Sequence, residues 1–400
     1  MKKKLLSLIL AAAMVSTLLV GCSSSTTTSS DTSTADDAVV EDDAVVEDDA
    51  ASADDGAASA DGLQVGIVLP TKDEPRWLQD QAQFEALLGD AGFTSQVLFS
   101  QGSSATEKTN VETLVSQGID VLIICAQDAA AAAAAVEAAK AEGVTVIAYD
   151  RLITGTEAVD YYVTFDSVSV GVAQGQYLID NAPEGSGIPL YLYAGAATDN
   201  NAFLFFEGAW SVLQPKIADG TFVIANSSEA VALQDKAELT RDEEAAIIGQ
   251  ITTDWDFNVA KSKAEAHLTA VGAESKGDVV ILGPNDGTAR SIADVFATDK
   301  DVTSYVITGQ DAEIASVQYI IDGTQSMTVF KDTRILAADS VAMAVSVLKG
   351  ETPATDATYD NGVVEVPSKQ TNVTIITKDN VKSELVDSGY YDASEFTGLE

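Results

Sequence analysis

The sequence predicts an α/β protein with two successive doubly wound parallel sheets, and its first half supplies two of the reasons. Short segments rich in apolar residues indicate the strands of a parallel sheet covered on both faces, at 65–69, 94–99, 121–124 and 144–148. Segments with helical spacing of apolar residues, or rich in alanine, lie between them at 77–91, 107–117 and 129–141. Gly92, Gly118 and Gly143 follow these segments, as expected for glycines that end helices.

The third reason is that the same alternation resumes in the second half of the chain. Further strands are predicted at 161–165, 190–193, 222–225, 279–282 and 305–308, with helices at 168–180, 202–213, 259–271 and 289–297. Two sheets explain this pattern better than one long sheet. Ligands of such sheets bind beyond the carboxyl ends of the strands. The residues that follow each strand are therefore the candidates for a binding site.

The N-terminus has the pattern of a bacterial export signal. Lys2, Lys3 and Lys4 precede an apolar stretch at 5–20, which is too short for an ordinary membrane-spanning helix. The string Leu19-Val20-Gly21-Cys22 resembles the lipobox of bacterial lipoproteins, and this resemblance implies that Cys22 is acylated and becomes the new N-terminus. We therefore expect a signal peptide at 1–21 and an extracytoplasmic protein, lipid-anchored to the bacterial cell membrane. The alternative is a plain secretory signal with an incidental cysteine.

Residues 22–62 are expected to form a disordered acidic tether. From Ser23 to Gly62 the chain has no Lys, Arg or aromatic residue, so its acidic groups repel one another and little can be buried. The segment is either a spacer or acidic filler that improves solubility. Over the whole chain, 62 acidic and 22 basic residues give a formal net charge of −40. This charge argues against partners such as nucleic acid or a broad anionic lipid surface.

The remaining cysteine and the single histidine give no sign of catalysis or metal binding. If Cys22 carries lipid, Cys125 has no disulfide partner, and its apolar neighbours at 121–124 predict a buried, inert thiol. His267 lies in a polar helical segment and is expected to be solvated. We expect no cofactor and no metal.

Polar and aromatic side chains follow the predicted strands throughout the chain. The candidates, read along the sequence, are Arg76, Trp77, Asp150, Arg151, Asn200, Trp255, Asn285, Asp311 and Lys331. Each alone is more often an ordinary loop or capping residue. Together they offer planar hydrogen-bonding groups and flat indole faces, which suit a neutral ligand with many hydroxyls. A phosphate site would need a Gly-rich loop at a helix start, and none follows a predicted strand.

The same stretches resemble a known family. The matching strings lie at 70–72, 76–77, 147–153, 199–202, 211–215, 309–312 and 329–333. They are similar to the xylose-binding and multiple-sugar-binding proteins of bacterial ABC importers over about residues 63–391. The resemblance implies a type I periplasmic-binding-protein fold, in which two Rossmann-like lobes are joined by a three-stranded hinge. The implied lobes are 63–166 plus 312–340, and 167–311 plus 341–400.

The resemblance also implies roles for the candidate residues. Trp77 and Trp255 would stack on a monosaccharide, and the other seven would hydrogen-bond to it. The function expected is that of a monomeric receptor that delivers an aldose of the xylose, glucose or galactose type to the permease subunits of an ABC importer. One alternative is a sugar sensor for chemotaxis or a sensor kinase. Another is an extracellular glycosidase that uses paired carboxylates such as Asp150 and Asp311.

Overall fold

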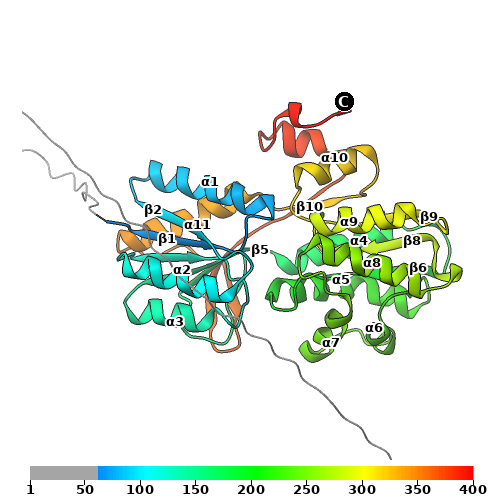
Figure 1. Cartoon of the computed structure of the whole chain (residues 1–400), viewed down its shortest axis with the longest axis horizontal. Coiled ribbons are helices and arrows are strands. Elements are labelled where there is room, and N and C mark those ends of the chain that lie inside the picture. Colours follow the sequence, from blue (N-terminus) through cyan, green and yellow to red (C-terminus); the bar gives the residue numbers. More distant parts are fainter. Residues whose placement is uncertain (1–61, 400) are drawn as a thin grey trace, which may run out of the picture. The chain divides into compact units, whose positions relative to one another are not determined.

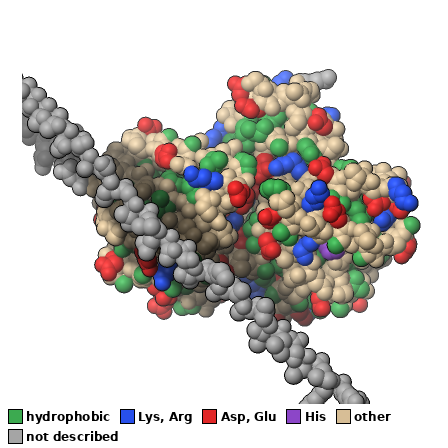
Figure 2. Space-filling model, viewed as in Figure 1, with side chains coloured by type: hydrophobic (Ala, Val, Ile, Leu, Met, Phe, Trp, Pro, Cys, Tyr) green, Lys and Arg blue, Asp and Glu red, His purple; other side chains and the backbone are tan. Residues whose placement is uncertain are grey.

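The computed structural model describes residues 62–399. The predicted signal peptide at 1–21, the lipid-bearing Cys22 and nearly all of the tether therefore lie outside the described residues. Within 62–399, no helix has both the length and the apolar composition needed to cross a membrane. On the face shown in Figure 2, acidic and basic side chains are interspersed over the surface.

The first lobe is built on a seven-stranded sheet. Its order is β11 (Ala357–Asp360), β12 (Glu365–Thr371), β5 (Tyr161–Phe165), β4 (Thr145–Tyr149), β3 (Val121–Ile124), β1 (Val65–Leu69) and β2 (Ser95–Phe99). All neighbouring strands are parallel except β11, which is antiparallel to β12. The central strands β1 and β3 are buried at every residue, as their uninterrupted apolar sequences predict.

Helices cover both faces of this sheet (Figure 1). On one face, α1 (Pro75–Asp90) and α11 (Thr333–Leu348) pack on alternate strand residues such as Ile67 and Ile147. On the other face, α2 (Ser104–Ser116) and α3 (Ala133–Ala141) pack on their neighbours, such as Val68 and Val146. The two-residue period of a strand thus sends successive side chains into two separate cores.

The second lobe has a four-stranded parallel sheet in the order β7 (Phe222–Ile224), β6 (Ile188–Leu192), β8 (Gly277–Leu282) and β9 (Val302–Ile307). Helices α4 (Ser167–Asn181), α5 (Asn200–Ala218) and α7 (Arg241–Ile251) contribute to the core on one face. Helices α8 (Phe257–Ala270) and α9 (Asp286–Thr298) cover the other. The short helix α6 (Ser228–Ala232) packs on α7. The fold is thus the predicted α/β fold with two parallel-sheet lobes.

The described chain passes between the lobes at three places. It leaves the first sheet after β5, returns between β10 (Thr328–Phe330) and α11, and leaves again between β12 and β13 (Thr374–Ile376). Strands β10 and β13 pair in an antiparallel ribbon. Helix α10 (Ile314–Asp322) packs on α9, and its apolar residues form a small core with the segment after β13.

These crossings differ from the predicted lobe boundaries. The predicted return to the first lobe at 312–340 is too early and too short, because α10 packs on the second lobe whereas β11 and β12 belong to the first sheet. We therefore propose lobes of 62–165 plus 333–371, and 167–330 plus 374–399. The sequence around 357–371 lacks the apolar run of a central strand, because β11 is an edge strand and β12 beside it alternates between buried and more exposed residues over much of its length.

Two further predictions concern single side chains. Cys125 is fully buried, as predicted, and burial raises the pKa of its thiol well above the usual value. His267 is half-buried instead of solvated, because its Nδ1 lies 3.2 Å from the hydroxyl of the buried Tyr193. Burial lowers the pKa of His267 to about 4, so this ring is neutral near pH 7.

Candidate functional site

Beyond the carboxyl ends of the strands, residues of both lobes surround one cavity, which we call the inner cavity. It measures about 20 Å³, room for about one water molecule. Its lining residues are Glu74, Arg76, Trp77, Asp150, Arg151, Asp199, Asn201, Phe205, Trp255, Asn285, Gln310, Asp311 and Lys331. Since this set joins cations, carboxylates, amides and indoles, it can donate to and accept from a polyhydroxylated molecule on all sides.

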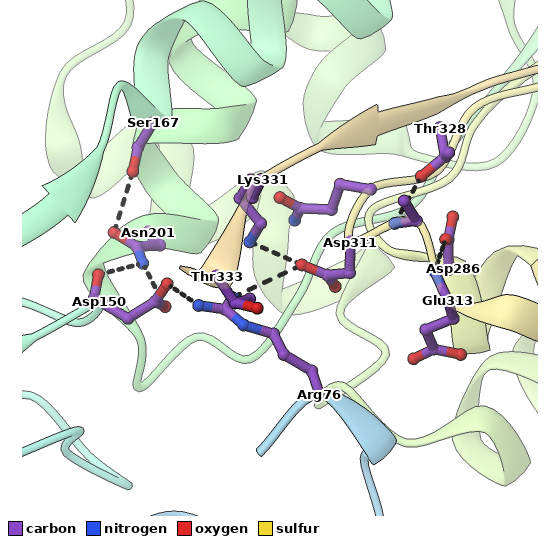
Figure 3. Close-up of polar contacts among 12 residues, drawn as sticks. Arg76, Asp150, Ser167, Asn201, Asp286, Asp311, Glu313, Thr328, Lys331 and Thr333 are labelled. Atoms are coloured by element: carbon purple, nitrogen blue, oxygen red, sulfur yellow. Dashed lines mark hydrogen bonds and ion pairs between the residues drawn. The ribbon is translucent and has the colours of Figure 1, made fainter. Parts of the chain in front are cut away.

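Arg76 lies at the centre of the polar contacts (Figure 3). It is the second residue of α1, a helix that begins at Pro75, and it is 5% exposed. Its Nη2 lies 2.6 Å from Asp150 Oδ2, and its Nη1 lies 3.5 Å from Asp311 Oδ1. One helical turn further on, the fully buried Asp80 lies 3.7 Å from Arg76 Nε. Arg76 therefore faces carboxylates from both lobes and from its own helix.

Asp150 is held by contacts from both lobes. It follows β4 in a left-handed backbone conformation, with φ of 61°, which is uncommon for a residue other than glycine. The side-chain amide of Asn201 donates to the Asp150 carbonyl oxygen at 2.8 Å and to its Oδ1 at 3.4 Å. Ser167 in turn donates to Asn201 Oδ1 at 3.2 Å. This chain of hydrogen bonds joins the start of α4 and α5 to the end of β4 (Figure 3).

A second group of contacts centres on Asp199. This residue is the N-cap of α5 and accepts a hydrogen bond from the backbone N–H of Asn201. Its Oδ2 lies 3.0 Å from Arg151 Nε and accepts from Trp255 Nε1 at 3.1 Å. Asp199 thus joins an arginine of the first lobe to a tryptophan of the second.

Lys331 and Asp311 form a third ion pair in the inner cavity. Lys331 follows β10 and is 4% exposed, and its Nζ lies 2.7 Å from Asp311 Oδ1. Asp311 has a φ of 97° and its N–H donates to the backbone of Val329, so the chain turns sharply here. The turn directs the carboxylate toward both Lys331 and Arg76 (Figure 3).

Burial and nearby charges set the protonation of the carboxyl groups that line the cavity. Burial alone would raise the pKa of Asp150, but Arg76 and Lys331 lower it below its usual value, so this carboxylate is ionised near pH 7. Burial raises the pKa of Asp199, against the opposing effect of Arg151. Burial also raises the pKa of Glu74 to about 7, despite the nearby Arg151.

Several polar atoms that face this region have no hydrogen-bond partner among the described residues. They include Trp77 Nε1 and Gln310 Oε1 of the inner cavity, whose side chains are almost fully buried. A buried polar atom without a partner costs free energy, so such atoms mark places where a ligand hydroxyl would be favourable.

Eight of the nine candidates from the sequence line the inner cavity, and Asn200 does not. Asn201 lines it in place of Asn200. Because Asp199 caps α5, these two residues are the first and second of the helix, and one residue turns the side chain by about 100° around the axis. Lys72, which also follows β1, is exposed and lies over the ring of Phe99 instead.

Other lining residues were not among the candidates. Glu74, Asp199 and Gln310 stand in the same strand-end strings as chosen residues, so only the direction of each side chain was unknown. Phe205 lies one helical turn after Asn201 on α5, and that spacing could have identified it. Within the described residues, no cluster of His, Cys, Asp and Glu is arranged to hold a metal ion.

Comparisons with known proteins bear directly on this arrangement. The profile of the periplasmic binding protein domain matches residues 65–352. A multiple sugar-binding periplasmic protein of Azospirillum brasilense is 36% identical over 340 residues, which cover 83% of this chain and 90% of that protein. The D-xylose-binding periplasmic protein of Escherichia coli is 30% identical over 333 residues, covering 83% and 92%.

Two solved structures are also similar. A carbohydrate transporter solute-binding protein of Chloroflexus aurantiacus, in complex with D-glucose, is 67% identical, with a TM-score of 0.83 and coverage of 84% of this chain and 99% of that one. An ABC transporter solute-binding protein of Clostridium phytofermentans, with bound β-D-glucose, is 31% identical, with a TM-score of 0.74 and coverage of 84% and 100%. The chain therefore belongs to the periplasmic binding protein family and is a binding protein, not an enzyme.

Proposed function

We propose that the protein is an extracytoplasmic, lipid-anchored receptor that binds one aldose in the inner cavity and delivers it to an ABC importer. The observation that carries this proposal is the joint contribution of both lobes to one buried, hydrogen-bonding cavity. The D-glucose complex of the similar Chloroflexus protein supports a neutral monosaccharide, and glucose in particular, as the ligand.

Each kind of lining group has a part in this binding. Asp150, Asp311 and Gln310 accept hydrogen bonds from sugar hydroxyls, while the nearby cations and indole N–H groups donate them. Trp255 offers a flat apolar surface to the C–H face of the ring. Trp77 has the guanidinium carbons of Arg76 and Arg151 at 4.6 and 5.4 Å from its ring centroid, so its stacking on a sugar would compete with these cations.

Binding is coupled to movement of the lobes. The inner cavity is smaller than a sugar ring, and the Arg76–Asp311 and Arg151–Asp199 contacts cross it between the lobes. A sugar therefore enters while the lobes are apart, and some of these contacts are exchanged for contacts with hydroxyls. The three crossing segments act as the hinge, and the ligand stabilises the closed form because only there does it touch both lobes.

Titration with a panel of monosaccharides, followed by tryptophan fluorescence and calorimetry, tests the proposal. We expect saturable binding of at least one aldose, with Asp150→Ala weakening it by about ten- to hundredfold, the equivalent of about 1.5–3 kcal/mol. Asp160→Ala, which removes a carboxylate outside the inner cavity, is the matched control. An Asp150→Ala variant that binds as tightly as the parent would remove this residue from the site.

The lipid anchor needs its own experiment, because Cys22 lies outside the described residues. We expect the protein expressed in a bacterium to incorporate labelled palmitate and to fractionate with membranes, whereas Cys22→Ala is released unlabelled. Labelling that persists in the Cys22→Ala variant would exclude this cysteine as the lipid site.

A further inference from the structure

A second and wider cavity adjoins the inner cavity, and we call it the outer groove. It is lined by residues at 71, 73–74, 101–102, 127, 151 and 254–258, and it measures about 490 Å³. Glu74, Arg151 and Trp255 line both spaces, so the two adjoin at these side chains. The outer groove thus leads from the inner cavity toward solvent.

The outer groove is present although the lobes already touch. The backbone N–H of Ala129 in the first lobe donates to the carbonyl of Thr198 in the second at 2.9 Å, close to the Arg151–Asp199 pair. A sugar in the inner cavity would leave the lobes no closer together than they are here. A substituent that passes beside Trp255, where Arg151 exchanges its contact with Asp199 for one with the ligand, could therefore extend into the outer groove.

The lining of the outer groove suits a second sugar ring. Phe257 is 51% exposed and presents an aromatic face, the usual partner of the apolar side of a pyranose. Gln101 and Gln127 contribute amides from the first lobe, and Asn258 contributes one from the second. This combination repeats, at the entrance, the aromatic and amide chemistry of the inner cavity.

The wall between the two spaces is firmly built. Asp254 and Trp255 have φ values of 54° and 59°, left-handed conformations that cost free energy in residues other than glycine. Thr252 Oγ1 donates to Asp254 Oδ1 at 2.8 Å, and Trp255 Nε1 is held by Asp199. A Cβ at Gly195 would overlap the Trp255 ring, so only glycine allows this packing. The indole ring of Trp255 is therefore held in place between the two spaces, and a sugar ring on either side could contact it.

The charge of the outer groove restricts what it accepts. Asp73, Glu74, Asp254 and Asp256 line it together with a single cation, Arg151, which is already paired with Asp199. A phosphate or carboxylate substituent would meet this excess of carboxylates and be repelled. A neutral substituent meets no such cost.

We propose that the ligand class extends to neutral disaccharides or glycosides, with one ring in the inner cavity and the second in the outer groove against Phe257. This inference rests on the proposed function, because it assigns a neighbouring subsite to the same ligand.

Calorimetry with glucose, cellobiose, maltose and glucose 1-phosphate tests it on the purified full chain. We expect at least one of the two disaccharides to bind within about tenfold of glucose, and the phosphate to bind far more weakly. Phe257→Ala should weaken the binding of that disaccharide by about fivefold, the size of a lost aromatic contact, and should change the affinity for glucose by less than about twofold. Val223→Ala, which truncates an apolar side chain that is also 51% exposed but lies on β7, should change neither.

The outcomes separate this inference from the proposed function. Glucose binding without binding of either disaccharide would overturn the second subsite and leave the receptor function standing. Disaccharide binding that Phe257→Ala does not weaken would overturn the assignment of the second ring to the outer groove. If no saccharide in this set or in the monosaccharide panel binds, both proposals fail together.

Discussion

The two lobes contribute unlike chemistry to the inner cavity. The first lobe supplies both arginines, Arg76 and Arg151, from the start of α1 and the end of β4. The second supplies Asp199 and Asp311 together with the amides of Asn201, Asn285 and Gln310. The first lobe also carries the carboxylates of Glu74 and Asp150, so we define the cationic half as the part of the cavity around the two arginines and the acidic half as the part around Asp199 and Asp311.

This difference explains how the lobes meet. The Arg151–Asp199 pair at 3.0 Å and the Arg76–Asp311 pair at 3.5 Å both cross from one lobe to the other. Buried charges need such partners, because an unpaired ion in a dry site is far more costly than a pair. On the proposed function, lobe closure and ligand binding therefore use the same side chains, and a neutral ligand would compete with contacts that the protein makes by itself.

The largest effect is expected at Asp199, where three contacts meet. Asp199→Ala leaves the buried Arg151 without its carboxylate, frees Trp255 Nε1 and removes the cap of α5. We expect the free energy of unfolding, measured in urea, to fall by about 3–5 kcal/mol. The double variant with Arg151→Ala should lose less than the sum of the two single losses, because the pair is broken only once.

Asp166→Ala is the matched control for this prediction. Asp166 also caps a helix, since its Oδ1 accepts from the N–H of Ser169 at the start of α4, but it forms no ion pair within the described residues. We expect a loss of about 1 kcal/mol, the usual cost of a lost cap. Equal losses for the two variants would contradict the view that charge pairing joins the lobes at Asp199.

A smaller effect is expected from pH in the cationic half. Burial raises the pKa of Asp80 to about 7, although Arg76 opposes this, so the folded state holds a proton that the unfolded state releases between about pH 4 and 7. The free energy of unfolding should therefore fall as pH rises through this window. Asp80→Asn cannot titrate, so between pH 5 and 8 its free energy of unfolding should fall by about 2 kcal/mol less than that of the parent. Urea unfolding at a series of pH values measures the slopes. Parallel slopes would show that Asp80 titrates normally.

In the acidic half, the next effect in size concerns Gly195. An added Cβ overlaps the Trp255 ring, so Gly195→Ala should displace the indole, cost about 1–2 kcal/mol and reduce the fluorescence response to sugar. At Gly287, on α9, an added Cβ meets its nearest atom at 3.8 Å, so Gly287→Ala should leave the response unchanged. A normal response in Gly195→Ala would mean that the position of Trp255 does not matter for binding.

The sequence predicts the strands of both lobes better than it predicts where each lobe begins and ends. Apolar runs such as 121–124 and 279–282 are strong signals because both faces of these strands are buried, and the structure places strands there. The edge strand β11 and its neighbour β12 both carry polar residues. Their place in the first sheet depends on a return of the chain that no local pattern encodes. The lobe boundaries differ for this reason.

For the inner cavity, the rule that ligands lie beyond strand ends points to the segments that line it, and eight of the nine chosen residues are among the lining residues. The choice of Asn200 over Asn201 could not be settled from sequence, because it depends on where α5 begins, and that is fixed by Asp199 as its cap. Asp80 lies outside the strand-end strings, on α1, and only the fold places it beside Arg76.

The smallest expected effects come from one exposed helical glycine in each lobe. Neither Gly89 on α1 nor Gly249 on α7 would bring an added Cβ within 4 Å of another atom, and neither has a left-handed backbone. Replacing either with alanine should raise the free energy of unfolding by about 0.5–1 kcal/mol, because alanine loses less backbone freedom in a helix. Both positions lie outside the inner cavity, so sugar affinity should stay unchanged in both variants. If sugar affinity changed in only one of the two variants, the helix that carries that glycine would take part in lobe closure. The difference between the lobes would then extend beyond the inner cavity.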